Sequence, residues 1–141
     1  MKTITSFKKN HDLLMPGFYL SDEKNGIYTY DLRFKKPNGG DYIGIAAAHS
    51  IEHLLATALR NSEYADNIVY FGPMGCRTGF YLLLKDIEPK LAEKITADAI
   101  TAALKENSVP GSKKIQCGNF RSHNLKQAKN ELQIYLNLLR Y

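Results

Sequence analysis

Residues 46–60, AAAHSIEHLLATALR, decide how the chain is organised, because they place a His-x-x-Glu-His pentad inside a helical stretch. The stretch consists of good helix formers and contains no Gly or Pro. At about 100° per residue, His53 lies about 40° round the helix from His49 and Glu52 about 60° the other way, so the three side chains can share one cavity. Two imidazoles at i and i+4 chelate a metal, and the neighbouring carboxylate can move protons, in the inverted order of the His-Glu-x-x-His zinc helix.

The alternative interpretation of the pentad is a helix with two surface histidines and a solvated glutamate. The flanking residues argue against it, because a helix that is apolar on most sides is buried. These flanking residues are Ile51, Leu54, Leu55, Ala58 and Leu59. Buried imidazoles and carboxylates need partners, and a metal would supply one.

The composition is that of an ordinary globular protein with one domain, residues 1–141. The chain is 44% hydrophobic and 23% charged, and its net charge of +5 is spread without a basic helix, so nucleic-acid binding is not indicated. No apolar run approaches 18 residues, and the N-terminus lacks the apolar core of a signal peptide. We therefore expect a cytoplasmic protein that neither crosses nor binds a membrane.

The pattern of elements predicts an α+β fold in which helices cover an antiparallel or mixed sheet. Asn25-Gly26 is a hairpin signal, and the alternation after it predicts a half-buried strand whose Thr29, Asp31 and Arg33 face away from the core. Asn124 with Gln127 resembles a capping box at the start of a final helix. The other expected elements are an extended arm over 1–20 that can include a short helix, strands at 27–34, 68–71, 80–85 and 114–117, and helices at 46–60, 89–106 and from 125 onward.

The two cysteines are too few for a disulfide framework. Cys117 lies in QCGN, where glycine lets the backbone pass close to a site, and a catalytic metal needs a third protein ligand besides the two histidines. A His2Cys set suits zinc or ferrous iron. Cys76 lies on a glycine-flanked turn beside Arg77, where exposed amides and a cation would favour the thiolate and make it a base or nucleophile. Taken singly, each cysteine is also compatible with a purely structural, packed residue.

Two other classes of protein fit the pentad. In an inverted-motif zinc metallopeptidase, a downstream acid would be the third ligand, and the candidates are Asp86, Glu88, Glu93 and Asp98. In a structural zinc-binding protein, four protein ligands would close the site, and Cys76 could be the fourth.

Three separated segments are similar to the S-ribosylhomocysteine lyase family (LuxS, autoinducer-2 synthase). They are HSIEH at 49–53, PMGCRTGFYL at 73–82 and QCGNFRSHNLKQAK at 116–129, and SFKKNH at 6–11 and YDLRFKKPN at 30–38 fit the same pattern. The resemblance covers nearly the whole chain in order. One departure is Tyr70-Phe71-Gly72, where many members have Asp-Ile-Ser, so we expect altered substrate contacts there.

The resemblance implies a homodimeric, cytoplasmic α+β metalloenzyme with its active site at the subunit interface. It implies His49, His53 and Cys117 as ligands of one divalent metal, with Fe²⁺ favoured and Zn²⁺ or Co²⁺ able to replace it. Glu52 and Cys76 would be the catalytic proton carriers. The resemblance further implies that Ser6, His11 and Arg33 bind substrate, with the N-terminal arm reaching the partner's site.

The implied reaction is the cleavage of S-ribosylhomocysteine to homocysteine and 4,5-dihydroxy-2,3-pentanedione, the precursor of autoinducer-2. It would proceed by carbonyl migration through enediolates and β-elimination. Such a lyase would belong to the methionine cycle and to quorum sensing.

Overall fold

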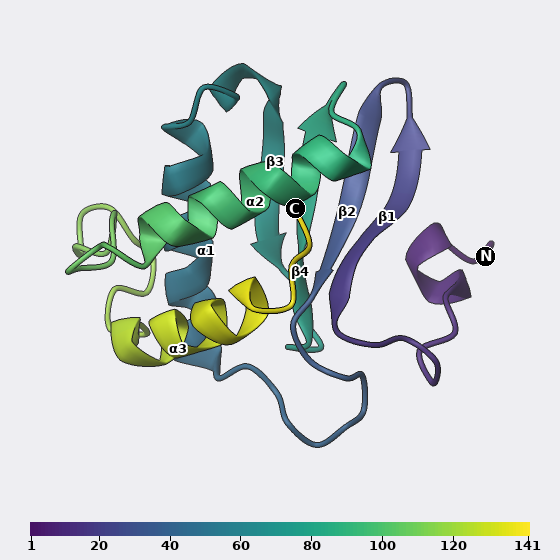
Figure 1. The fold of residues 1–141 in the computed structure, drawn as a ribbon. Helices are drawn as coiled ribbons and strands as arrows, with labels where there is room; N and C mark the ends of the chain where they lie inside the picture. Colours follow the sequence, from purple (N-terminus) through teal and green to yellow (C-terminus); the bar gives the residue numbers. More distant parts are fainter.

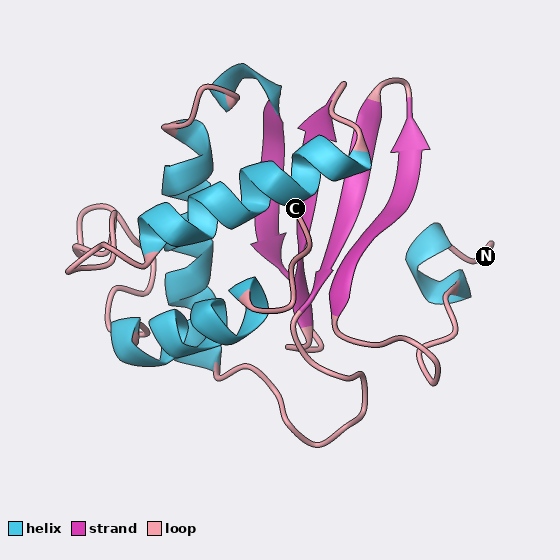
Figure 2. Cartoon of the chain, viewed as in Figure 1, coloured by secondary structure: helices cyan, strands magenta, loops and turns pink.

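The computed structural model describes residues 1–141 and shows one four-stranded antiparallel sheet with three helices on one of its faces (Figure 1; Figure 2). The strands are β1 (Gly17–Lys24), β2 (Ile27–Arg33), β3 (Ile68–Pro73) and β4 (Gly79–Lys85), in the order β1-β2-β4-β3. The helices are α1 (Ile45–Arg60), α2 (Pro89–Ala103) and α3 (Leu125–Leu136), with 3₁₀ turns η1 (Thr5–Lys8) and η2 (Ala65–Asn67). The predicted α+β class is confirmed, and the sheet is antiparallel throughout.

The hairpin between β1 and β2 forms where Asn25-Gly26 predicted it. Both residues have positive φ, 54° and 81°, as a tight two-residue turn requires. The strand before this turn was not predicted, because most of β1 is exposed and a bulge between Leu20 and Asp22 interrupts its alternation. The predicted extended arm therefore ends at Gly17, where the sheet begins.

Strand β2 is buried on both sides at its C-terminal end, so the prediction of a half-buried strand is wrong there. Tyr30 and Leu32 point into the core, as predicted. Asp31 and Arg33 are on the opposite face, yet they are only 0% and 2% exposed. They are buried because they bind each other and because Lys9 of the N-terminal arm contacts Asp31.

Helix α1 packs against β3, α2 and α3 through its apolar stripe. Ile51, Leu54, Leu55 and Leu59 are at most 1% exposed, so the predicted burial of this helix is confirmed. His49, Glu52 and His53 are half-buried, outside the apolar stripe. The helix is thus held rigidly by one side while its pentad remains accessible from another.

The segment between α2 and α3 has no strand, so the predicted strand at 114–117 is wrong. Its backbone pairs locally instead, with the Cys117 N–H donating to the Lys113 carbonyl at 3.0 Å. Helix α2 also ends at Ala103, three residues before its predicted end. The capping residue of α3 is confirmed, since Asn124 Oδ1 accepts a hydrogen bond from the Gln127 N–H at 3.0 Å.

No helix has the length and apolar character needed to cross a membrane.

Candidate metal centre

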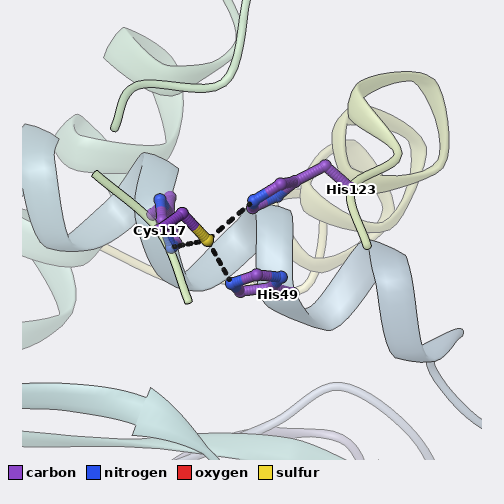
Figure 3. Close-up of side chains that lie close together, drawn as sticks. His49, Cys117 and His123 are labelled. Carbon is purple, nitrogen blue, oxygen red and sulfur yellow. Dashed lines mark hydrogen bonds between the residues drawn. The ribbon is translucent and has the colours of Figure 1, made fainter. Parts of the chain in front are cut away.

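The two histidines of the pentad and Cys117 converge at one point beside α1. Cys117 Sγ lies 3.5 Å from His49 Nε2 (Figure 3). It lies 4.0 Å from His53 Nε2. The two imidazole rings stand nearly perpendicular, at 86° with centroids 4.7 Å apart, and the Nε2 atoms of both lie near Cys117 Sγ. The structure therefore brings together the three ligands that the sequence predicted.

Backbone carbonyls hold both imidazoles in the tautomer that a metal requires. His49 Nδ1 lies 2.7 Å from the Ser122 carbonyl oxygen, and His53 Nδ1 lies 2.9 Å from that of Pro110. A carbonyl can only accept, so each Nδ1 carries the hydrogen and each Nε2 presents a lone pair toward Cys117. Hydrogen bonds from the far nitrogen are the usual outer support of metal-bound histidine.

His123 is a fourth residue of the cluster, and sequence reasoning did not assign it a role. Its Nε2 lies 3.6 Å from Cys117 Sγ, and the four possible ligand atoms lie within 4.8 Å of one another. Burial, and then the positive charges that His49 and His53 can carry, lower the pKa of His123, which favours a neutral ring. The one signal in the sequence was its place in the quoted segment 116–129, six residues after Cys117.

The spacing of the cluster fits a tetrahedral metal. Metal–sulfur bonds of about 2.3 Å and metal–nitrogen bonds of about 2.0–2.1 Å place a ligating sulfur and nitrogen about 3.5 Å apart. The distance from Cys117 Sγ to His49 Nε2 has this value, and the one to His53 Nε2 is half an ångström longer. Imidazole and thiolate donors suit zinc or ferrous iron better than magnesium or calcium.

The residues that were expected to complete the site in the two alternative classes of protein, a downstream acid and Cys76, are absent from the cluster. No carboxylate belongs to it, so the downstream acid of an inverted-motif peptidase is not present. Cys76 is not part of it either, and hence cannot close a four-ligand structural zinc site. The cluster instead offers His123 as a fourth side chain.

Glu52 has the freedom that a proton carrier needs. Its side chain is half-buried and forms no hydrogen bond or ion pair with the rest of the chain. It is adjacent in sequence to His53 on the same rigid helix. A carboxylate without a fixed partner can accept and return a proton without breaking another interaction.

Cys76 is exposed on the turn between β3 and β4, where a chain of polar contacts begins. Its Sγ lies 3.1 Å from Thr78 Oγ1, which accepts a hydrogen bond of 2.8 Å from Arg33 Nη1. Arg33 is in turn held by Asp31, and Lys9 Nζ contacts the same carboxylate at 2.7 Å. The cation linked to the thiol is therefore Arg33 and not the neighbouring Arg77, because the Arg77 guanidinium lies over the ring of Tyr42, donates to the Ile43 carbonyl and forms no hydrogen bond with the thiol.

The three residues for which the resemblance implies substrate binding lie away from the metal cluster of their own chain. Arg33 is buried and donates hydrogen bonds to Asp31 and Thr78. Ser6 lines a groove of about 370 Å³ on the sheet face that the helices leave open, and His11 Nδ1 lies 3.0 Å from the Lys9 carbonyl oxygen. The arm that carries Ser6 and His11 thus contacts its own subunit.

Asp31→Asn is expected to lower the free energy of unfolding by about 3–5 kcal/mol, because it leaves a buried guanidinium without its carboxylate. Urea unfolding at one protein concentration and one metal concentration measures the change. The matched control is Asp98→Asn, which removes the exposed partner of Lys94 and should leave the unfolding midpoint unchanged. Equal midpoints for the two variants would show that the Asp31–Arg33 pair does not stabilise the fold.

Comparison with known proteins extends the local similarity to the whole chain. The sequence matches the family described as S-Ribosylhomocysteinase (LuxS) over residues 4–140. An S-ribosylhomocysteine lyase of Borreliella afzelii is 46% identical over 149 aligned residues, which cover 99% of this chain and 93% of that protein. A protein of the same name from Clostridium beijerinckii is 45% identical, and the alignment covers 97% of this chain and 91% of that protein. Both matches include the segments that carry the cluster.

Proposed function

We propose, from the premise that this chain belongs to the S-ribosylhomocysteinase (LuxS) family, that it cleaves S-ribosylhomocysteine with the side chains gathered on α1 and on the β3–β4 turn. The chain is an S-ribosylhomocysteine lyase, a carbon–sulfur lyase that produces homocysteine and the autoinducer-2 precursor 4,5-dihydroxy-2,3-pentanedione. The single observation that carries the proposed site is the convergence of His49, His53 and Cys117.

The chemistry of the substrate explains why such a site is needed. A thioether leaves by β-elimination only when the carbon that loses its proton is next to a carbonyl. The sugar carbonyl must therefore migrate along the chain, which requires protons to move between neighbouring carbons and oxygens. In the last step a base removes a carbon-bound proton, the electron pair forms a C=C bond, and the thiolate leaves with the C–S pair and is protonated. No oxidant or reductant takes part.

His49, His53 and Cys117 would hold one divalent metal per subunit. When bound, the metal supplies a Lewis acid that stabilises negative charge on the substrate oxygens by several kcal/mol. The fixed tautomers of the two histidines and the distances to Cys117 Sγ support this ligand set. We assign ferrous iron as the metal, with zinc or cobalt as replacements, on the resemblance and on the mixed thiolate and imidazole donors.

Cys76 and Glu52 are the two proton carriers of the proposal. Cys76 as thiolate removes and returns the carbon-bound protons, because its sulfur is exposed and its polar contacts lead to a guanidinium. Glu52 exchanges protons with the substrate oxygens and with the leaving thiolate, because it shares α1 with the ligands and has no other partner. Each group is worth roughly 10²–10⁴-fold in rate.

In this proposal, two chains bring these groups together. The β3–β4 turn lies at the end of the sheet, whereas the loop that follows α2 lies on the other side of α1 from the strands (Figure 1). No hydrogen bond joins Cys76 to the cluster, and the only side chain hydrogen-bonded to it is that of Thr78. We therefore propose a homodimer in which the Cys76 turn of one subunit faces the metal cluster of the other.

Exposed apolar side chains support this pairing, since they gather on the two segments that it brings into contact. In the arm, Phe7 and Leu13 are 73% and 76% exposed, and in the metal-binding loop Ile115 is 94% exposed. Apolar surface of this kind marks interaction sites. Ser6, His11 and Arg33 would act from the same side as Cys76, because Lys9 and Asp31 tie the arm to the Cys76 network.

The pairing predicts which inactive variants complement each other. Glu52→Gln mixed with Cys76→Ala should recover about a quarter of wild-type activity, because half of the dimers are mixed and each mixed dimer has one intact site. His11→Ala mixed with Cys76→Ala should recover none, because both groups come from the same subunit. Homocysteine release after subunit exchange is the readout, and mass spectrometry of the native dimers confirms that exchange occurred.

The opposite pattern would overturn the pairing. Recovery with His11→Ala and none with Glu52→Gln would place the arm and Cys76 at different sites. Recovery in neither mixture, with exchange demonstrated, would mean that each site is built from one chain. The proposal also requires a reducing compartment such as the cytoplasm, because both free thiols must stay reduced to bind metal and to move protons.

A further inference from the structure

His123 raises the question of whether the metal site is open or closed. Four protein ligands would close it, as in structural zinc sites, whereas a lyase needs a position at which substrate can bind. The distance of 3.6 Å from Cys117 Sγ to His123 Nε2 does not separate the two cases, because it suits both a shared metal and an N–H···S hydrogen bond.

The stacking of two imidazole rings distinguishes a closed four-ligand site from an open one. The rings of His49 and His123 lie face to face, with centroids 3.9 Å apart and an interplanar angle of 23° (Figure 3). A nitrogen lone pair lies in the plane of its ring, so two ligands of one metal need planes that meet at the metal. Planes stacked in this way do not meet within bonding distance. Only one of the two rings can therefore be a ligand in this arrangement, whereas His53 stands at 86° to His49 and can join it.

Ser50 decides which of the two rings is the ligand. Its side chain is fully buried, and its Oγ already accepts a hydrogen bond of 2.8 Å from the Asn124 N–H. The hydroxyl hydrogen still needs an acceptor, and the only other partner is His123 Nδ1 at 3.1 Å. His123 Nδ1 thus accepts, which places the ring hydrogen on Nε2. His49 has the reverse tautomer, since its Nδ1 donates to the Ser122 carbonyl.

We infer that His123 is not a metal ligand but a positioning residue, which donates its Nε2–H to the sulfur of Cys117 in the tautomer that Ser50 imposes. The inference rests on the proposed function for the metal itself. The hydrogen bond draws electron density from the thiolate, so the sulfur donates less to the metal and the metal remains a stronger Lewis acid. It also leaves a coordination position free for substrate.

The Co²⁺-substituted protein tests the inference without substrate, because its absorption reports both the ligand set and the thiolate. His123→Gln keeps an N–H near the position of Nε2 but has no ring nitrogen to bind the metal, whereas His123→Ala has neither. Both variants should bind one Co²⁺ per subunit with unchanged visible d–d bands. His123→Ala should move the sulfur-to-cobalt charge-transfer band to longer wavelength, because the sulfur then donates more electron density to the metal. His123→Gln should keep the band close to that of the wild type.

A second pair of variants keeps the test valid if His123→Ala does not fold. Ser50→Ala removes the group that sets the tautomer and should shift the charge-transfer band in the direction expected for His123→Ala, whereas Ser50→Thr keeps the hydroxyl and the wild-type band. His49→Ala is the ligand control and should lose stoichiometric Co²⁺.

Loss of Co²⁺ or altered d–d bands in both His123 variants would make His123 a ligand and overturn the inference. A charge-transfer band that is the same in all four His123 and Ser50 variants would also overturn it. Failure of the proposed function would look different, because the wild-type Co²⁺ protein would then show its normal spectrum but release no homocysteine from S-ribosylhomocysteine.

Discussion

Cys76→Ala and Glu52→Gln are each expected to lower kcat by at least about 10²–10⁴-fold while the metal and the fold are retained. The physical reason is that both side chains lie outside the ligand cluster, so they can be replaced without disturbing it. Cys76 forms a side-chain hydrogen bond only with Thr78, and Glu52 forms no hydrogen bond or ion pair. Steady-state homocysteine release, metal content and far-UV circular dichroism of the same preparations measure the three quantities.

Thr78→Val is the matched control for Cys76. It keeps the shape of the side chain but removes the hydroxyl that joins the thiol to Arg33, so it should lower kcat by less than Cys76→Ala. A Cys76→Ala protein that releases homocysteine at a rate near that of the wild type would show that the thiol is not the base. One that is purified without metal would show that Cys76 is a ligand.

Replacement of any one of His49, His53 and Cys117 by Ala should abolish stoichiometric metal binding and, with it, turnover. It should also lower the melting temperature, because a metal that binds only the folded chain stabilises it by mass action. At a metal concentration 1,000-fold above Kd the loss is about 4 kcal/mol. For a domain of this size that corresponds to on the order of 10 °C. Metal analysis after gel filtration and thermal unfolding with and without added metal measure both effects.

The two cysteines provide an internal control for this prediction. Cys117→Ala should lose the metal, whereas Cys76→Ala should keep it, although both variants remove one thiol and both should be inactive. Full metal occupancy after the loss of His49, His53 or Cys117 would contradict the ligand set.

The parts of the fold that local sequence determines could be predicted. The pentad lies in an uninterrupted run of helix formers, so the helix and the shared side of its three half-buried functional groups follow from the spacing. The hairpin turn at Asn25-Gly26 and the helix cap at Asn124 depend only on nearby backbone and side chains. The structure has both at the predicted positions. The place of Cys117 beside the two histidines could be anticipated, because a catalytic metal would need one more donor.

The parts that depend on contacts across the chain could not be predicted. His123 owes its tautomer to Ser50, which is 73 residues away in the sequence. The burial of Asp31 depends on Lys9 of the arm and on Arg33, and an alternating pattern alone predicts a solvated face for these charges. The short apolar segment around Ile115 resembled a strand, yet it has no neighbouring strand with which to pair and forms a turn that carries Cys117 to α1.

The most direct test is the incubation of the purified, Fe²⁺-loaded protein with S-ribosylhomocysteine and a thiol reagent under anaerobic conditions. The account predicts one thiol released for each substrate molecule consumed, no release after the metal is removed by a chelator, and recovery when Fe²⁺, Co²⁺ or Zn²⁺ is added back. A protein with full metal occupancy that releases no thiol, or an equally fast release by the chelated protein, would contradict it.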